Sequence, residues 1–146
     1  MARYQAAAEA RSAAAPDTVW ALVADGARWS DWTTFTRSSL EKEGDPPPDG
    51  VGAIRRFGTG PVTSREQVVE FDPPRRLAYT ILSGFPVRNY RATVELTPDG
   101  TGTRISWSGT FDAKLPGTGW FVRPFVGRIY RTFSKRLARA AEQRAG

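Results

Sequence analysis

Residues 115–146 read LPGTGWFVRPFVGRIYRTFSKRLARAAEQRAG, and this C-terminal segment decides the fold. Its apolar residues recur at steps of three and four, the spacing of one face of an α-helix. They are Val122, Phe125, Val126, Ile129, Phe133, Leu137 and either Ala140 or Ala141. The basic residues fall mostly off this stripe: Arg123, Arg128, Arg131, Lys135, Arg136, Arg139 and Arg144. A helix with so large an apolar face must bury it, and most of the preceding chain has strand character, so we expect the helix to lie on a sheet.

Pro124 restricts where this helix begins, because a proline inside a helix removes a backbone hydrogen bond and clashes with the preceding turn. Either Pro124 lies in the first turn, where proline is tolerated, or the helix is kinked there. We favour the first arrangement and predict a regular helix that begins between Thr118 and Arg123.

The composition is typical of one globular domain with its own core, since 40% of the 146 residues are hydrophobic and 25% are charged. No run of residues is long and apolar enough to cross a bilayer. The segment that follows Met1 lacks the apolar core of a signal peptide. We therefore expect a soluble cytoplasmic protein.

The sequence contains neither cysteine nor histidine. Without cysteine there are no disulfides, thiol nucleophiles or cysteine metal sites. Without histidine, the commonest general base, the Ser-His-Asp triad and most zinc sites are excluded. We expect no metal and no cofactor, so any catalysis must use carboxylates, Tyr, Lys, Arg or a held water molecule.

The first third of the chain mixes strand and helix signals. Residues 4–14 alternate like a strand, although their many alanines would also suit a helix. Pro16 and Asp17 begin a short helix that ends at residues 25–26, and a second short helix or turn follows at 27–32. Residues 35–43 suit a strand, and the prolines that follow predict a loop over residues 44–50.

Strands dominate after this loop, separated by turns rich in Gly, Pro and Asp. We place them near residues 51–57, 62–71, 76–83, 89–97 and 103–111. Short connections between them predict an antiparallel meander with one solvated face. The expected order is one strand, two short helices, six strands and a long helix, which makes an α+β domain over residues 1–146.

Several motifs in this order resemble the polyketide cyclase/dehydratase branch of the START-like, or Bet v 1-like, superfamily (SRPBCC). The resemblance extends over almost the whole chain. The residues that carry it are Ala15-Pro16, Val19-Trp20, Asp25, Trp29, Trp32, Val51-Gly52, the run from Glu70 to Leu77, and the run from Gly102 to Trp107.

The resemblance implies a helix-grip fold, in which a seven-stranded antiparallel sheet curls around the C-terminal helix and encloses a mostly apolar cavity. Members of this superfamily bind lipids, sterols, polyketides or plant hormones, and some cyclise or dehydrate polyketide intermediates. The superfamily has no universal catalytic motif, so no catalytic residue is transferred to this chain.

Aromatic and aliphatic side chains are the candidates for a ligand-binding lining, because ligand sites are mostly apolar. The candidates are Trp32, Phe57, Tyr79, Tyr90, Trp107, Phe111, Trp120, Phe121, Phe125, Ile129 and Phe133, and Trp29 belongs to the same aromatic set. Trp107 and Phe125 are the strongest candidates for wall positions. The alternative is that these residues form a packed aromatic core.

Two glycine-containing loops suit the mouth of a cavity. Residues 115–121 place two glycines beside Trp120 and Phe121, and residues 84–87 carry Phe85 as a candidate lid residue. Loops often carry function, but both segments also suit plain connections between elements.

The candidates for acid/base chemistry are Glu66, Glu70, Asp72, Tyr79 and Tyr90. If Glu66 points into an apolar cavity, desolvation raises its pKa and makes it a usable proton carrier. The alternative is a solvated glutamate on the convex face of the sheet. Val68 favours burial of the Glu66 face whereas Phe71 favours the other face, and a bulge would reconcile them.

Arg55 and Arg56 raise the same question, since one of them faces inward if their strand is regular. A buried arginine can hold a ligand carboxylate or enolate, and it can equally form a cross-strand ion pair. Our catalytic candidates are therefore Glu66, Arg56 and Tyr79.

We expect a hydrophobic small-molecule ligand and no nucleic acid, because the sequence has no helix-turn-helix, zinc knuckle or RNP-like motif. Trp120 and Phe121, followed by arginines, suit transient contact with an anionic membrane. The leading hypothesis is a carrier or sensor for a lipid-like or polyketide-like ligand. The second is a cofactor-free cyclase or dehydratase, and the third is a regulatory domain that binds a partner through an apolar patch.

Overall fold

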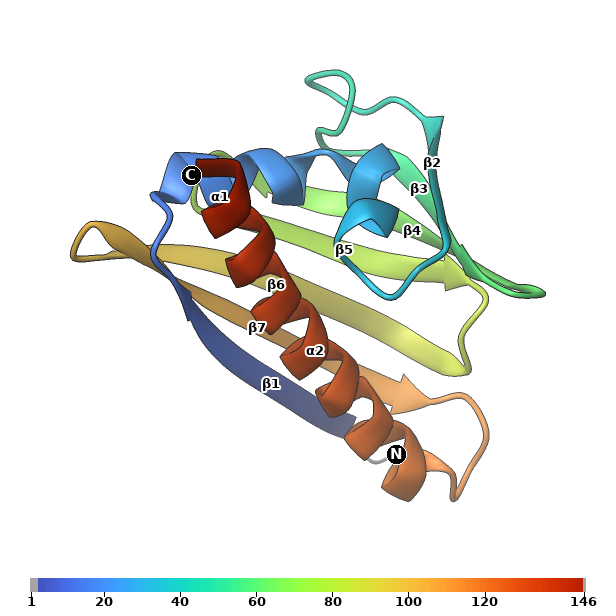
Figure 1. Ribbon diagram of the computed structural model, residues 1–146. Helices are drawn as coiled ribbons and strands as arrows, with labels where there is room; N and C mark the ends of the chain where they lie inside the picture. The colour runs from blue at the N-terminus through green and yellow to red at the C-terminus, as the bar shows by residue number, and fades with distance from the viewer. Residues whose placement is uncertain (1–2, 146) are drawn as a thin grey trace.

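A seven-stranded antiparallel sheet curls around one long helix in the computed structural model, which describes residues 3–145 (Figure 1). The elements in chain order are β1 (Arg3–Ser12), α1 (Pro16–Ala24), the 3-10 helix η1 (Gly26–Asp31), β2 (Arg37–Lys42), β3 (Ile54–Thr59), β4 (Val62–Asp72), β5 (Arg76–Ser83), β6 (Val87–Asp99), β7 (Gly102–Ala113) and α2 (Gly119–Ala145). This arrangement confirms the predicted α+β helix-grip fold.

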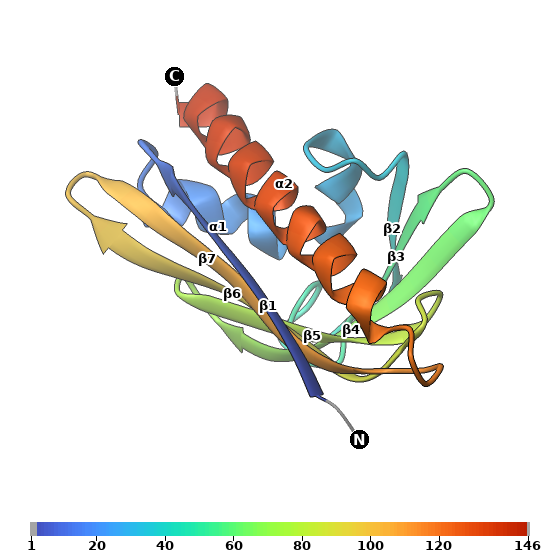
Figure 2. The same cartoon turned by 90° about the horizontal axis from the view of Figure 1, so that it is seen from below.

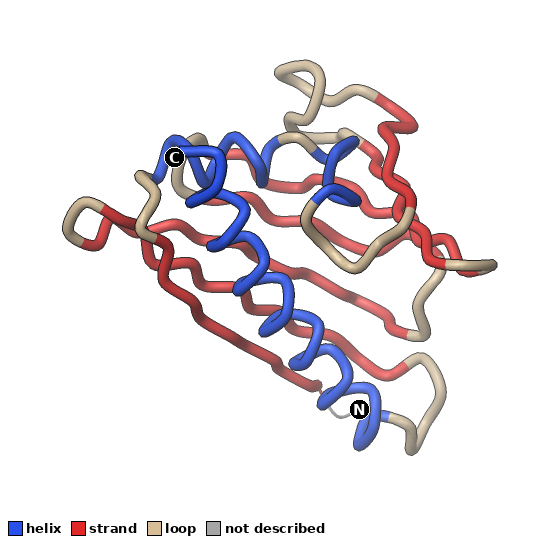
Figure 3. Tube along the Cα trace, in the orientation of Figure 1, coloured by secondary structure: helices blue, strands red, loops and turns tan. Residues whose placement is uncertain are grey.

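The strands follow the order β1-β7-β6-β5-β4-β3-β2, so β2 to β7 form a meander and β1 closes the sheet against β7. The first and the last strand of the chain are therefore direct neighbours. Helices α1, η1 and α2 lie on one side of the sheet, as Figure 3 shows, and the sheet curves beneath them when the molecule is seen from below (Figure 2). None of the described helices is long and apolar enough to cross a membrane.

Helix α2 begins at Gly119, within the predicted range, and the predicted stripe faces the sheet. Val126, Phe133 and Leu137 are buried, whereas Phe125 is half exposed near the N-terminal end. Pro124 lies inside the helix rather than in its first turn, so our placement of this residue was wrong. Its missing N–H leaves the carbonyl one turn earlier without the usual helical donor.

A bulge in β4 settles which of its side chains face the helices. The register against β5 shifts between Val68 and Glu70. Before the shift, Glu66 and Val68 point to the concave side and are buried. After it, Phe71 packs against Trp20 on the inner side, and Glu70 points outward. One extra residue thus reconciles the two conflicting signals in this strand.

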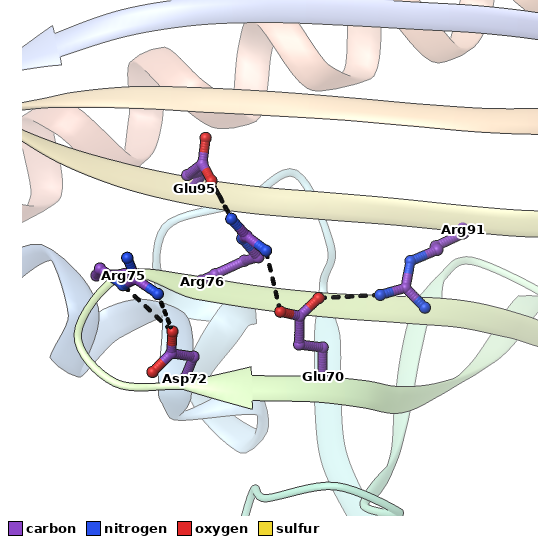
Figure 4. A network of polar contacts seen from close by, with 6 residues as sticks. All are labelled: Glu70, Asp72, Arg75, Arg76, Arg91 and Glu95. Carbon is purple, nitrogen blue, oxygen red and sulfur yellow. Dashed lines mark hydrogen bonds and ion pairs between the residues drawn. The ribbon is translucent and has the colours of Figure 1, made fainter.

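The outer face of the sheet carries a network of ion pairs (Figure 4). Glu70 accepts hydrogen bonds from Arg76 (3.2 Å) and Arg91 (2.9 Å), and Arg76 also donates to Glu95 (2.8 Å). Because these side chains are solvent-exposed in part, each pair contributes only about 0–1 kcal/mol to stability. The face is therefore a solvated surface.

The predicted strand over residues 51–57 begins later than expected, at Ile54. Gly52 has a φ of +93°, in the left-handed region that favours glycine, and the chain turns there instead of extending. The loop before it closes back on itself, because Asp45 and Val51 exchange backbone hydrogen bonds of 2.9 and 3.1 Å. This loop positions Asp49, which becomes part of the core.

Candidate functional site

A cavity of about 240 Å³ lies between the concave face of the sheet and the N-terminal half of α2. Its walls come from η1, from strands β3 to β6, from the β5–β6 loop and from α2. The lining residues are Trp29, Phe35, Phe57, Thr59, Val62, Ser64, Glu66, Tyr79, Ile81, Gly84, Phe85, Tyr90, Phe125, Val126, Ile129, Tyr130 and Phe133. Most are aromatic or aliphatic, which suits an apolar ligand.

Three buried tyrosines, Tyr79, Tyr90 and Tyr130, line the cavity. The indole N–H of Trp107 donates to the Tyr79 hydroxyl at 3.1 Å, so the core fixes the orientation of that phenol. The hydroxyls of Tyr90 and Tyr130 hydrogen-bond to each other across the gap between β6 and α2. Burial raises the pKa of all three phenols, so they stay protonated and act as neutral donors and acceptors.

Glu66 is the only acidic side chain in the lining, and it is buried. Desolvation raises its pKa to about 8, and the positive charge of Arg55 opposes that rise. Glu66 makes no side-chain hydrogen bond or ion pair with residues 3–145. Near neutral pH this group is therefore mostly a protonated acid with an unused donor that faces an apolar cavity.

Arg55 is the inward-facing member of the arginine pair, and it serves the core rather than the cavity. Its Nε donates to the carboxylate of Asp49 at 3.1 Å, and its Nη2 reaches the carbonyls of Val23 and Ala24 at 3.4 and 3.2 Å. Its guanidinium also lies over the ring of Trp29 at 5.2 Å. These contacts tie the α1–η1 junction to β3, and they leave Arg55 with little capacity to hold a ligand.

Arg56 was a catalytic candidate, but the structure places it outside the cavity. Its side chain is half exposed on the outer face of β3 and approaches Glu41 at 4.0 Å. Alternation along the strand explains this position, because Arg55 points inward and its neighbour must point outward.

Six of the predicted ligand-binding residues line the cavity: Phe57, Tyr79, Tyr90, Phe125, Ile129 and Phe133. The other five lie elsewhere. Trp32, Trp107 and Phe111 are buried in the packed core, and Trp120 and Phe121 are exposed outside it. Our placement of Trp107 in the wall was wrong, because its ring is covered by the rings of neighbouring aromatic residues.

The structure adds lining residues that were not predicted as ligand-binding: Trp29, Phe35, Thr59, Val62, Ser64, Ile81, Gly84, Phe85, Val126 and Tyr130. Tyr130 follows Val126 by four residues and precedes Phe133 by three, so helical spacing already placed it on the same face. Phe35 carried no such signal, because it lies in the turn before β2 and reaches the cavity only through the tertiary fold.

Phe85 and Phe125 meet at one end of the cavity, where their rings stack at 5.9 Å. Phe125 is 51% exposed although it also lines the cavity, so this pair marks the mouth. Gly84 beside it has a φ of +97°, a conformation that permits the sharp turn into β6. The role of this loop as a lid stays a prediction.

Comparison with protein families matches residues 3–142 to the family described as "Polyketide cyclase / dehydrase and lipid transport". No curated protein matches the sequence. A protein from Thermobifida fusca, solved by NMR, is 28% identical, with a TM-score of 0.79 over 95% of this chain and 93% of that one. XoxI from Bacillus cereus is 23% identical, with a TM-score of 0.77 over 100% and 99%. A START superfamily protein from Mycobacterium smegmatis is 15% identical, with a TM-score of 0.81 over 95% and 97%.

Proposed function

Since the chain belongs to the polyketide cyclase/dehydrase and lipid transport family, whose fold binds hydrophobic ligands, we propose that it carries or senses a hydrophobic small molecule held in the cavity. The observation that carries this proposal is the cavity itself. It is lined mostly by apolar groups and opens beside the stacked rings of Phe85 and the exposed Phe125. Burial of an apolar ligand there contributes roughly 25 cal/mol per Å² of area removed from water.

The cavity favours a small ligand with one neutral polar end. Its volume of about 240 Å³ is below the ~300–1,000 Å³ that is usual for drug-sized ligands. Glu66 and Tyr79 are among the few polar lining residues, and they can hydrogen-bond a carbonyl or hydroxyl. A ligand carboxylate is disfavoured, because no cation is among the lining residues within the described range 3–145, and the nearby Arg55 is held by Asp49.

A cavity-filling variant tests this proposal. Ile129→Trp places an indole in the lining, and Arg128→Trp adds the same group to the exposed side of the same helix as a matched control. Native mass spectrometry of protein purified without detergent should find a co-purified small molecule on the natural protein and on the control. Its loss from Ile129→Trp is expected. Equal retention by both variants would place the ligand outside the cavity.

A second candidate function is a cofactor-free cyclase or dehydratase, and the burial of Glu66 in the cavity wall favours it. A carboxylic acid with a pKa of about 8 can deliver a proton to a carbonyl or take one from an adjacent carbon near neutral pH. Tyr79 would hold the developing oxyanion through its hydroxyl.

Turnover of a short poly-β-ketone thioester separates the two functions. If the protein is an enzyme, Glu66→Gln should lower kcat by about 10²–10⁴-fold while KM changes little. Binding without turnover by the natural protein would leave the carrier or sensor function and remove the enzymatic one.

A further inference from the structure

Four large apolar side chains are exposed at the N-terminal end of α2, and we call them the apolar tip: Leu115, Trp120, Phe121 and Phe125. Trp120 is 76% exposed, and its ring contacts that of Phe121 edge-on at 5.2 Å. Phe125 follows one helical turn later and belongs to the cavity mouth. An apolar group of this kind on a protein surface marks an interaction site.

The charged residues from Lys114 to Arg139, a stretch that includes the apolar tip and most of α2, have one sign. Seven cations occur between Lys114 and Arg139, and this segment contains no acidic residue. None of the seven forms an ion pair with an acidic side chain among residues 3–145. Arg76 and Arg91 on the outer face of the sheet differ, because Glu70 and Glu95 neutralise them (Figure 4). The helix thus offers uncompensated positive charge beside exposed aromatic rings.

A groove between β1 and α2 contains both an exposed aromatic ring and cations of the helix. Trp120, Arg123 and Arg131 line the groove on its helix side. Tryptophan favours the interface between lipid headgroups and acyl chains, and arginine favours anionic headgroups. A projecting tip, in contrast to a flat apolar patch, inserts into a bilayer more readily than it fits a second protein surface.

We propose that the apolar tip of α2 docks the protein reversibly on the surface of an anionic lipid bilayer. Trp120 and Phe121 enter the headgroup region, and the cations of α2 lie above the anionic lipids. Since Phe125 belongs to both the tip and the cavity lining, docking brings the cavity mouth to the membrane. The docking itself goes beyond the proposed function, because it needs no ligand in the cavity.

Trp120 provides its own probe. The other four tryptophans, Trp20, Trp29, Trp32 and Trp107, are all at most 8% exposed. Vesicles of phosphatidylcholine mixed with phosphatidylglycerol should shift the Trp120 emission to the blue, and brominated acyl chains should quench it. Vesicles of phosphatidylcholine alone should do neither, and added salt should release the protein, because screening weakens attraction to the surface.

Double variants separate the contribution of the aromatic side chains from that of the positive charges in a vesicle flotation assay. Trp120→Ala with Phe121→Ala should weaken binding about ten-fold or more. Arg128→Gln with Arg131→Gln should weaken it by about five-fold per arginine. Val51→Ala removes an exposed apolar side chain from the β2–β3 loop, far from the start of α2 in Figure 1, and should leave binding unchanged.

Several outcomes would overturn the proposal: no quenching of Trp120, equal binding to neutral vesicles, or equal binding by the Trp120→Ala variant. Self-association that Trp120→Ala abolishes, without vesicle binding, would instead assign the tip to a second copy of the chain. Ile129→Trp should lose the cavity ligand and still bind vesicles. Docking and ligand binding can therefore fail separately.

Discussion

Arg55 and Glu66 lie directly opposite each other on β3 and β4, and both side chains are buried on the concave face. Their surroundings differ completely. Arg55 is held by Asp49 and two backbone carbonyls, whereas Glu66 has no such partner and faces the cavity. One buried ionisable group is therefore part of the framework, and the other is available to a ligand.

The concave face of the sheet is divided in the same way, into a packed framework and a part that is open to a ligand. Where α1 and η1 cover the sheet, the rings of Trp29, Trp32 and Trp107 pack against one another at centroid distances of 5.2–6.4 Å. No residue of α1 lines the cavity, which forms between the sheet, η1 and the N-terminal half of α2. Covering helices thus determine which part of the face is core and which part is site.

The largest expected effect comes from removing the framework cation. Arg55→Met leaves Asp49 buried without its partner, so we expect the free energy of unfolding to fall by about 3–5 kcal/mol. Urea denaturation followed by circular dichroism measures it. Arg56→Met is the matched control on the exposed face and should cost less than about 1 kcal/mol. Similar losses for both variants would remove the distinction between the two arginines.

An effect of comparable size and opposite sign is expected at Glu66. Its pKa in the folded protein is about 8, above the ordinary value of 4.5, so the folded state binds more protons than the unfolded state between these values. The stability from this group is therefore fully present below about pH 4.5 and is lost as the pH rises through about 8.

The side chain in the Glu66→Gln variant cannot ionise, so this variant should not lose stability as the pH rises through about 8. Relative to the natural protein, the variant should gain on the order of 5 kcal/mol of stability as the pH rises across that window. Urea unfolding at several pH values measures the difference. Glu70→Gln, on the outer side of the same strand, provides the control. Parallel pH profiles for the natural protein and Glu66→Gln would show that Glu66 is solvated.

The tyrosine hydroxyls beside the cavity should affect the free energy of unfolding less than Arg55 or Glu66 does. Tyr130→Phe removes the hydrogen bond to Tyr90 and keeps the ring in place. We expect a loss of about 1 kcal/mol, near the net value of one hydrogen bond. Thermal denaturation of Tyr130→Phe, Tyr90→Phe and the double variant measures the coupling between them. Additive losses would mean that the two hydroxyls do not interact.

The smallest effect is expected on the outer face. Arg91→Gln removes one contact to Glu70, whose other partner Arg76 remains in place. The change in unfolding free energy should stay below about 1 kcal/mol and shrink further in high salt. A loss comparable with that of Arg55→Met would make this network part of the framework too.

The sequence predicted the framework better than the site. Helical spacing identified α2, and turn residues separated the strands, because both signals are local. The cavity residues depend on distant contacts. Trp107 and Tyr79 are both buried on the inner face, yet covering aromatic rings place Trp107 in the core while Tyr79 lines the cavity. The orientation of Glu66 depended on a one-residue bulge that the sequence only suggested.

The pairing of β1 with β7 has a consequence for how the chain folds. Arg3 meets Asp112, 109 positions later, so β1 has no neighbour in the sheet until β7 is available. Contacts of such long sequence separation slow folding, because the loop must close before they form. We expect refolding to be rate-limited by capture of β1, with the β2–β7 meander formed earlier and briefly exposing its β7 edge.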